Sequence, residues 1–352
     1  MKTFLRYGTV HVLVGLCLIP LTSFSHHSVF GRFDQDSSME IEGRVTEVYW
    51  RNPHVYVFVE VTDQNDKRVT WELETNTASR LLRSGIQADS IKVGDYVKVA
   101  GWPPVTAAKE IFATNLLLPS GEELILTSRA EPIWKNEATG DRSFQFHTEG
   151  DSSRPDLGIF RTWNHTDVIP MLFPAAFDTD YDVNDYPMTD VARATLAAYD
   201  PATDNPTLNC TPKGMPTIME QPYPMEFVQQ DENVFLRIEE YDLVRMIHMD
   251  DDRSLEEQPL SPLGYSVGTW DGDTLVVTTT RLNWPFFDQT GIPQSEDAEL
   301  VERFDPTEDG SRLDYELTVT DPLNFTEPVI SEKYWLYLLD EKVLPFDCSV
   351  RG

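Results

Sequence analysis

The chain has 352 residues and a formal net charge of −31 at pH 7. This length exceeds what one hydrophobic core ordinarily organises, and it therefore predicts two domains. So acidic a surface repels nucleic acid and anionic lipid, which makes both poor partners. The acidity fits a salty habitat as well as a cationic ligand, so the charge alone does not separate these two explanations.

Residues 1–25 have the pattern of a secretory signal peptide. Lys2 and Arg6 form a basic start, Val10–Pro20 is largely apolar, and Ser23–Ser25 is a small-x-small cleavage site. The apolar run is too short to cross a bilayer core of ~30 Å as a helix, so we expect no membrane insertion after signal removal. The sequence predicts a periplasmic or secreted protein.

Cysteine usage fits the same location. Cys17 leaves with the signal peptide, and Cys210 and Cys348 remain. In an oxidising compartment the simplest expectation is one disulfide that ties the middle of the chain to its end. Two free buried thiols are the alternative.

Residues 26–130 are predicted to form a small β domain. Three strands, a short helix and two more strands follow one another, which is the order of an OB-type barrel, although small sandwiches share the pattern. The expected elements are strands at Met39–Trp50, His54–Thr62 and Lys67–Glu74, a helix at Thr77–Arg83, and strands at Lys92–Val99 and Ile111–Leu118.

Residues 131–156 are polar and lack apolar periodicity, so we place an interdomain linker there. Residues 157–352 are predicted to form a larger antiparallel β-barrel or sandwich. They include one helix, with Thr189 as the N-cap of Val191–Tyr199. Five prolines from Pro206 to Pro224 keep this segment extended, and we expect it to wrap around the barrel rather than join it.

The strongest local signal is the hairpin at residues 263–280. Asp271-Gly272 lies between two runs rich in Val, Thr, Tyr and Trp, which is typical of a two-residue type I′ turn. The predicted cross-strand pairs are Trp270 with Asp273, Val267 with Val276, and Tyr265 with Thr278. Further strands are expected at Phe227–Met249, Ala298–Phe304, Arg312–Thr320 and Ser331–Leu339.

Two sets of short motifs carry a resemblance. The first half contains His26–Ser28, Trp50–His54, Trp71–Glu74 and Lys92–Asp95, and it resembles an uncharacterised family of small secreted bacterial proteins. The second half contains Cys210–Pro216, Gln221–Met225 and Gly268–Leu275, and it resembles a second group of exported bacterial proteins without an assigned activity. The resemblance implies an exported two-part protein and supplies no catalytic residue.

A copper site is one functional hypothesis. Cleavage after Ser25 would make His26 the first residue, and its α-amine and ring nitrogens would suit Cu(II). His27 or His54 would be the next ligand. The alternative is a frayed terminus with two solvated histidines, and in that case no cofactor is expected.

A polar ligand surface is a second hypothesis. On one continuous strand, Arg237, Glu239, Tyr241 and Arg245 would share a face that lines a barrel interior. The alternative is a solvated outer face with weak cross-strand ion pairs. Tyr265 and Trp270 of the hairpin are the remaining predicted ligand-binding residues.

Catalysis has weaker support. His165 and His248 are the candidate general bases for a cofactor-free lyase or isomerase. The sequence has no Gly-x-Ser-x-Gly elbow, no phosphate-binding Gly-Lys-Thr loop and no His-Glu-x-x-His motif.

The leading hypothesis is therefore an exported protein that binds a small or extended ligand without catalysis. It rests on many aromatic residues in the second domain, which suit apolar or planar ligands and a cavity of ~300 Å³ or more. These residues are Trp163, Phe173, Tyr223, Tyr265, Trp270, Trp284, Phe286 and Phe287. The sequence does not predict an oligomeric state.

Overall fold

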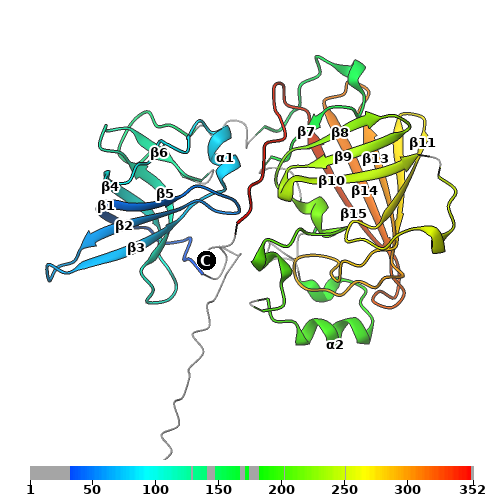
Figure 1. Ribbon diagram of the computed structural model, residues 1–352, viewed down its shortest axis with the longest axis horizontal. Coiled ribbons are helices and arrows are strands. Elements are labelled where there is room, and N and C mark those ends of the chain that lie inside the picture. Colours follow the sequence, from blue (N-terminus) through cyan, green and yellow to red (C-terminus); the bar gives the residue numbers. More distant parts are fainter. Residues whose placement is uncertain are drawn as a thin grey trace, which may run out of the picture.

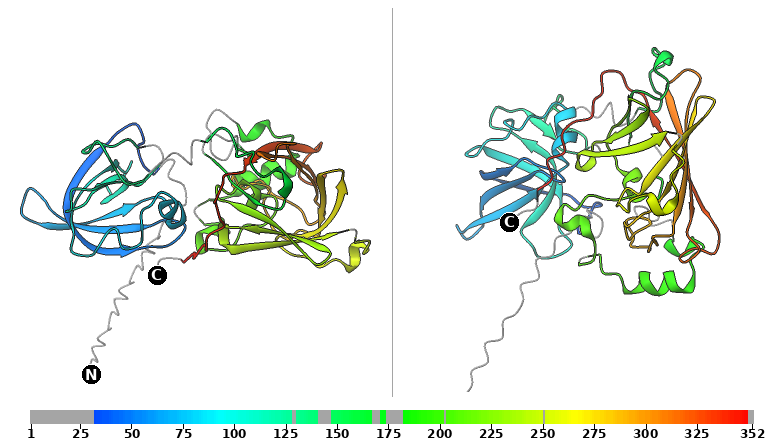
Figure 2. Two further views of the ribbon diagram at one scale, coloured as in Figure 1. Left: turned by 90° about the horizontal axis from the view of Figure 1, so that it is seen from above. Right: turned by 45° about the vertical axis from the view of Figure 1, so that its right-hand side comes forward.

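The computed structural model consists of two β-barrels side by side (Figures 1 and 2). It describes residues 32–127, 130–140, 147–166, 171–173, 182–201, 203–249 and 251–349. The predicted signal peptide and the first two predicted copper ligands, His26 and His27, lie outside these residues. In the described part of the chain, no helix is long and apolar enough to cross a membrane.

The small barrel confirms the predicted OB-like order. Its elements are β1 (Met39–Tyr49), β2 (Tyr56–Thr62), β3 (Arg68–Glu74), α1 (Ala78–Arg83), β4 (Tyr96–Trp102), β5 (Glu110–Leu117) and β6 (Glu123–Ile125). β3 and β5 pair in parallel and close a five-stranded barrel in the order β1-β2-β3-β5-β4, and β6 extends the sheet beyond β5. The helix begins one residue later than predicted, because Thr77 is its N-cap: the Thr77 side chain accepts a hydrogen bond from the Arg80 N–H.

The large barrel is a sheet of nine strands in sequence order. They are β7 (Thr162–Trp163), β8 (Met225–Gln230), β9 (Asn233–Ile238), β10 (Leu243–Met249), β11 (Tyr265–Asp271), β12 (Thr274–Thr280), β13 (Glu299–Pro306), β14 (Arg312–Thr320) and β15 (Val329–Leu336). All neighbours are antiparallel except β10 and β11, which are parallel. Asn164 and Leu336 exchange backbone hydrogen bonds of 2.8 and 3.0 Å, which join the first strand to the last.

Helices occupy the connections of the large barrel. The predicted helix is α2 (Asp190–Ala198), capped by Thr189. The remaining helices are short 3₁₀ turns: η2 (Pro155–Leu157), η4 (Val183–Asp185), η5 (Pro206–Asn209), η6 (Thr217–Glu220), η7 (Glu240–Asp242) and η8 (Leu255–Glu257). α2 lies below one end of the barrel in the view of Figure 1.

The hairpin of β11 and β12 forms, but its register differs from the prediction by two residues. The observed pairs are Trp270 with Leu275, Val267 with Thr278, and Tyr265 with Thr280. The two-residue loop is therefore Gly272-Asp273. Only its first residue has a positive φ, 65° at Gly272, as a type II′ turn requires, so the predicted type I′ turn was wrong.

The stretch predicted as the strand Phe227–Met249 is divided among β8, β9 and β10. The chain reverses at η7, where Tyr241 and Asp242 have φ values of 62° and 51°. Leu243 then pairs with Ile238 across the turn. The predicted shared face required one continuous strand, and this requirement is not met. It concerned Arg237, Glu239, Tyr241 and Arg245.

Polar side chains help to fill the interior of the large barrel. Arg245 donates hydrogen bonds to Ser266 (2.9 Å), Thr279 (2.6 Å) and both carboxylate oxygens of Glu302, and Tyr315 donates one to Glu302 (2.9 Å). The Arg245 and Glu302 side chains are 1% and 0% exposed. Because every partner in this group is buried, the ion pair is compensated inside the barrel.

The proline-rich segment also enters the barrel core. All four residues of η6 are buried, and the carboxylate of Glu220 lies 3.3 Å from the ammonium of Lys333 on β15. Ile218 and Met219 pack in the same hydrophobic cluster as the inward side chains of the strands. The prediction that this segment only wraps around the barrel was therefore wrong for η6.

Arg83 links the two barrels. Arg83, at the end of α1, donates to both carboxylate oxygens of Glu239, to Glu341 (3.0 Å) and to the Lys342 carbonyl (2.8 Å). Glu239 also accepts a hydrogen bond from the Leu344 N–H (2.7 Å). Figure 2 shows the C-terminal tail running between the barrels, along the same junction.

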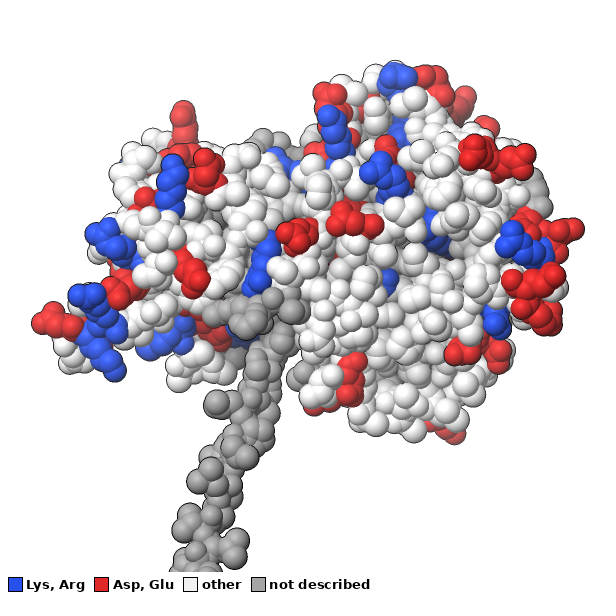
Figure 3. Space-filling model, in the orientation of Figure 1, with Lys and Arg blue, Asp and Glu red and all other residues white. Residues whose placement is uncertain are grey.

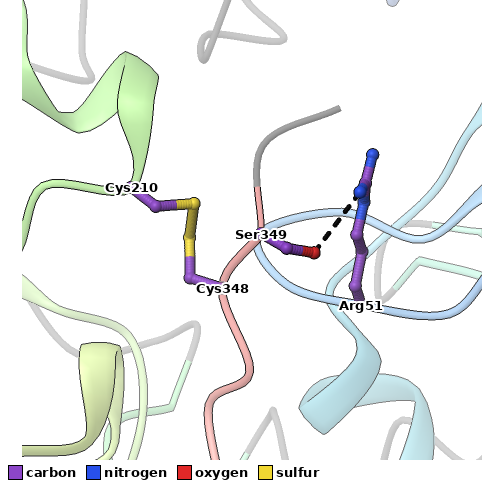
Figure 4. The surroundings of a disulfide bond; sticks show 4 residues. All are labelled: Arg51, Cys210, Cys348 and Ser349. Carbon is purple, nitrogen blue, oxygen red and sulfur yellow. Dashed lines mark hydrogen bonds between the residues drawn. A yellow bond between two sulfur atoms is a disulfide. The ribbon is translucent and has the colours of Figure 1, made fainter. Parts of the chain in front are cut away.

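The predicted disulfide holds this tail. Cys210 and Cys348 are bonded, with a sequence separation of 138 and 5.9 Å between their Cα atoms. In Figure 4, Ser349 next to the bond accepts a hydrogen bond from Arg51 of the small barrel. The disulfide thus ties the segment before η6 to a tail that touches both barrels.

The interior ion pair gives a stability prediction. Arg245→Leu should lower the free energy of unfolding by about 3–5 kcal/mol, because it leaves the buried carboxylate of Glu302 without a counter-charge. The matched control is Arg237→Leu on the outer face, where the Arg237 side chain is 52% exposed and pairs with Glu226. There the cost should be under ~1 kcal/mol in urea unfolding. Equal costs for the two variants would contradict the assigned interior position.

Candidate functional site

A small pocket lies where the end of α2, η5 and η6 meet the connection between β12 and β13. Its lining residues are Tyr199, Asn205, Thr207, Thr217, Trp284, Phe286, Asp288 and Gln289. Its volume is about 20 Å³, which is room for about one water-sized group. The pocket therefore suits the end of a ligand rather than a whole drug-sized molecule.

Asp288 is the charged residue of this lining. It is 2% exposed, and its Oδ1 accepts hydrogen bonds from the N–H (2.9 Å) and hydroxyl (2.6 Å) of Thr290. This is an Asx turn, which places the carboxyl at the tip of the connection. Its other oxygen, Oδ2, is buried and has no hydrogen-bond partner in the part of the chain that the structure describes.

Burial raises the pKa of Asp288 to about 6, against the hydrogen bonds from Thr290 and Ile292, which favour the ionised form. The charge of Glu220 raises the pKa further. An unpartnered buried carboxyl oxygen carries a desolvation cost of about 1–3 kcal/mol or more. A group that donates a hydrogen bond to Oδ2 would recover part of this cost.

Three aromatic rings form the walls. Phe286 meets Tyr199 edge-on at 5.3 Å between centroids and Trp284 at 5.9 Å. Gly291 makes room for the Tyr199 ring: it has a φ of 97°, and a Cβ there would lie 2.3 Å from that ring. The glycine is therefore required both by the backbone conformation and by the packing of the wall.

Hydrogen bonds hold the wall of the pocket in place. The Trp284 Nε1–H donates to the Thr217 hydroxyl (2.9 Å), and that hydroxyl donates to the Phe286 carbonyl (3.1 Å). Trp284 and Thr217 are 6% and 1% exposed. The wall is thus built into the core and does not depend on a ligand for its position.

The four residues predicted on one polar face are separated in the structure. Arg237 lies on the outer face, Glu239 binds Arg83 at the junction, and Arg245 lies inside the barrel. Tyr241 packs against Phe346 of the tail, with 5.4 Å between ring centroids. They do not form one site.

The two hairpin residues are also apart from the pocket. Tyr265 stacks on His248 (4.4 Å between centroids) and donates a hydrogen bond to Asp251 (2.5 Å). Trp270 is 44% exposed near the end of the hairpin. His248, a candidate base, is thus engaged in an aromatic stack, and burial together with Arg253 lowers its pKa.

His165, the other candidate base, lies beside the seam between β7 and β15. Burial lowers its pKa well below the usual value, and the charges of Lys333 and Arg80 act in the same direction. Its Nδ1 atom is buried without a hydrogen-bond partner among the described residues. It does not line the pocket of Asp288, so its role as a base stays a prediction.

The third predicted copper ligand is described, and it has other partners. The Nδ1 atom of His54 lies 2.8 Å from the Thr75 carbonyl oxygen and 3.5 Å from Glu74. Within the described ranges, no group of three or more His, Cys, Asp or Glu side chains could hold a metal ion. The copper set that includes His26 and His27 stays a prediction.

The sequence pointed to part of the pocket. Of the eight aromatic residues singled out, Trp284 and Phe286 line it. Trp163, Phe173, Tyr223, Tyr265 and Phe287 are buried side chains. Sequence reasoning missed Asp288 and Tyr199. The sequence signal for Asp288 was an acidic residue directly after an aromatic run. The sequence signal for Tyr199 was only its position at the end of a helix.

Residues 15–110 match the model of a family of unknown function (DUF6152). The match extends to the first residue of β5 and does not reach the large barrel. No curated protein matches the chain. The resemblance of the first half to an uncharacterised family is thereby supported, and that of the second half stays a prediction.

Charged side chains are spread widely over one face of the molecule. In the face drawn in Figure 3, acidic side chains are spread over both barrels and mixed with basic ones. With a net charge of −31, the whole molecule attracts cations over long range, and salt weakens this attraction.

The raised pKa of Asp288 predicts a pH dependence. An unfolded aspartate titrates near 3.8, so the folded chain holds this proton more tightly, and the resulting stability disappears as the pH rises from about 4 to about 6. Asp288→Asn removes this titration. Relative to the wild type, the variant's free energy of unfolding should therefore increase over that interval, by about 1.4 kcal/mol per unit of pKa shift.

Urea unfolding at a series of pH values measures this difference. Asp297→Asn, an exposed position on the same connection, is the control for the loss of one carboxylate. A difference between Asp288→Asn and the wild type that stays constant across the interval would contradict the raised pKa.

Proposed function

We propose that this chain is an exported protein that binds a small ligand, without catalysis, at the pocket of Asp288. The observation that carries the proposal is the buried Asp288 in the lining of a pocket with aromatic walls, because its Oδ2 atom has no hydrogen-bond partner among the described residues. Aromatic walls together with a few placed polar groups are typical of small-molecule sites. At about 20 Å³ the pocket is much smaller than the cavity of ~300 Å³ or more that was expected from the sequence.

Export is supported by two features. Residues 1–25 have the pattern of a signal peptide. The bond between Cys210 and Cys348 is of a kind that persists in oxidising compartments such as the periplasm or the extracellular space.

Binding rather than catalysis is supported by the groups in the lining. Asp288 and Tyr199 are the titratable residues among those that line the pocket. The pKa of Tyr199 is raised to about 12, mainly by burial, so its hydroxyl is a poor acid–base partner near neutral pH. The remaining side chains are aromatic rings, hydroxyls and amides, which recognise a ligand but do not activate it.

The rim allows the ligand to extend outward. Asn205, Thr207 and Gln289 are each partly exposed and line the pocket together with the buried Thr217. Their amide and hydroxyl groups can donate and accept hydrogen bonds. We infer a ligand that inserts one small group beside Asp288 and leaves its larger part at this rim.

Binding is tested on the folded, mature protein with a panel of small soluble probes that includes alkylamines, alcohols and amides. We expect at least one probe class to shift the backbone N–H signals of Thr290 and Ile292 in NMR spectra, because both amides contact Asp288. The same probes should change the fluorescence of Trp284, which forms part of the wall.

Gly291→Ala is the variant that closes the pocket. Its Cβ would meet the ring of Tyr199, so probe binding should be lost while Asp288 is retained. Gly272→Ala is the control, because it also places alanine at a positive φ but has no atoms within 4 Å of the new Cβ. If no probe shifts either amide in the wild type, the proposal is wrong.

A further inference from the structure

We propose that the group taken up beside Asp288 is a primary ammonium, so that the ligand is a small alkylamine in its protonated form. This inference rests on the proposed binding function and specifies the chemical class of the ligand. Four features of the pocket lead to it: the free acceptor, the sign of the charge, the aromatic walls and the size.

Asp288, which lines the pocket, has one carboxyl oxygen that accepts no hydrogen bond among the described residues. Thr290 donates two hydrogen bonds to Oδ1, and the Ile292 N–H also interacts with the carboxyl group, but Oδ2 is left without a partner. An ionised carboxylate only accepts hydrogen bonds. The partner that completes this site must therefore be a donor, which excludes ethers, carbonyl groups and carboxylates as the inserted group.

The charge of the surroundings favours a cationic donor over a neutral one. The charged group with the largest effect on Asp288 is a second carboxylate, that of Glu220. Glu220 already has its own ammonium partner in Lys333, at 3.3 Å, whereas Asp288 has none among the described ion pairs. A hydrogen bond from an ammonium to a carboxylate is roughly twice as strong as one between neutral groups.

The walls suit a cation as well. Trp284, Tyr199 and Phe286 meet at edge-on angles of 67° and 80°, so their rings face different directions around one corner of the pocket. A cation within about 6 Å of such a ring face is stabilised by the quadrupole of the ring, and more strongly when water is excluded. The three rings also give the carbon chain of an amine an apolar surface.

Size separates a primary ammonium from bulkier cations. A pocket of about 20 Å³ accepts a group about as large as one water molecule. An –NH₃⁺ group meets this limit, whereas a quaternary trimethylammonium group exceeds it. The alkyl chain would leave between Tyr199 and the rim residues Asn205 and Thr207.

The test compares n-propylammonium with 1-propanol, propionamide and tetramethylammonium near neutral pH, with the NMR shifts of Thr290 and Ile292 as the readout. We expect n-propylammonium to bind most tightly. Asp288→Asn should weaken its binding by at least about tenfold, the loss expected for one charge-assisted hydrogen bond. Asp297→Asn, which removes an exposed carboxylate from the same connection, should leave it unchanged.

If Asp288→Asn does not fold, Tyr199→Leu is an independent test, because it removes one aromatic wall and keeps the carboxylate. This variant should weaken the binding of n-propylammonium more than the binding of 1-propanol. Equal binding of 1-propanol and n-propylammonium, insensitive to Asp288→Asn, would overturn the inference and leave the proposed function standing. Preference for tetramethylammonium would overturn it too. No shift with any compound would refute both.

Discussion

Nine strands enclose a wider space than the eight whose side chains just fill a barrel, and this chain must occupy that space from within. It does so with a buried ion pair, Arg245 with Glu302, and with η6, whose Glu220 reaches Lys333 on β15. These charges are tolerated because each has a buried partner. Asp288, a carboxyl at the edge of the same core, has no counter-charge and no hydrogen-bond partner for its second oxygen among the described residues. The need to fill the barrel thus explains why a charged pocket lies beside η6.

The sequence predicted the fold closely where local signals are strong. Alternating residues placed the strands of the OB-like barrel within a few residues, and Thr189 was correctly predicted as an N-cap. The errors arose where tertiary contacts decide. The hairpin loop at Gly272 lies one residue later than predicted, which changes the strand register by two residues. The reversal at Tyr241 depends on positive φ values that are uncommon for its residue type.

The candidate site was harder to predict, because its parts come from distant segments. Trp284 and Phe286 were singled out as aromatic residues, but the residues that line the pocket with them, Tyr199 and Thr217, lie at the end of α2 and in η6. The proline-rich segment was predicted to wrap around the barrel. Its burial in the core shows instead that it forms one side of the pocket. The polar face expected on Arg237 and Arg245 does not form, because the chain turns between these residues and separates them. Burial and chain reversal, rather than composition, define this site.

The central claim is that Oδ2 of Asp288 is held free for a donor that the ligand supplies. A crystal structure of the mature protein with n-propylammonium tests it directly. The account predicts the ammonium nitrogen within hydrogen-bond distance of Oδ2, with its carbon chain against Tyr199 and Trp284. A structure in which Oδ2 bonds to a donor of the protein itself, and the amine is absent from the pocket, would contradict it.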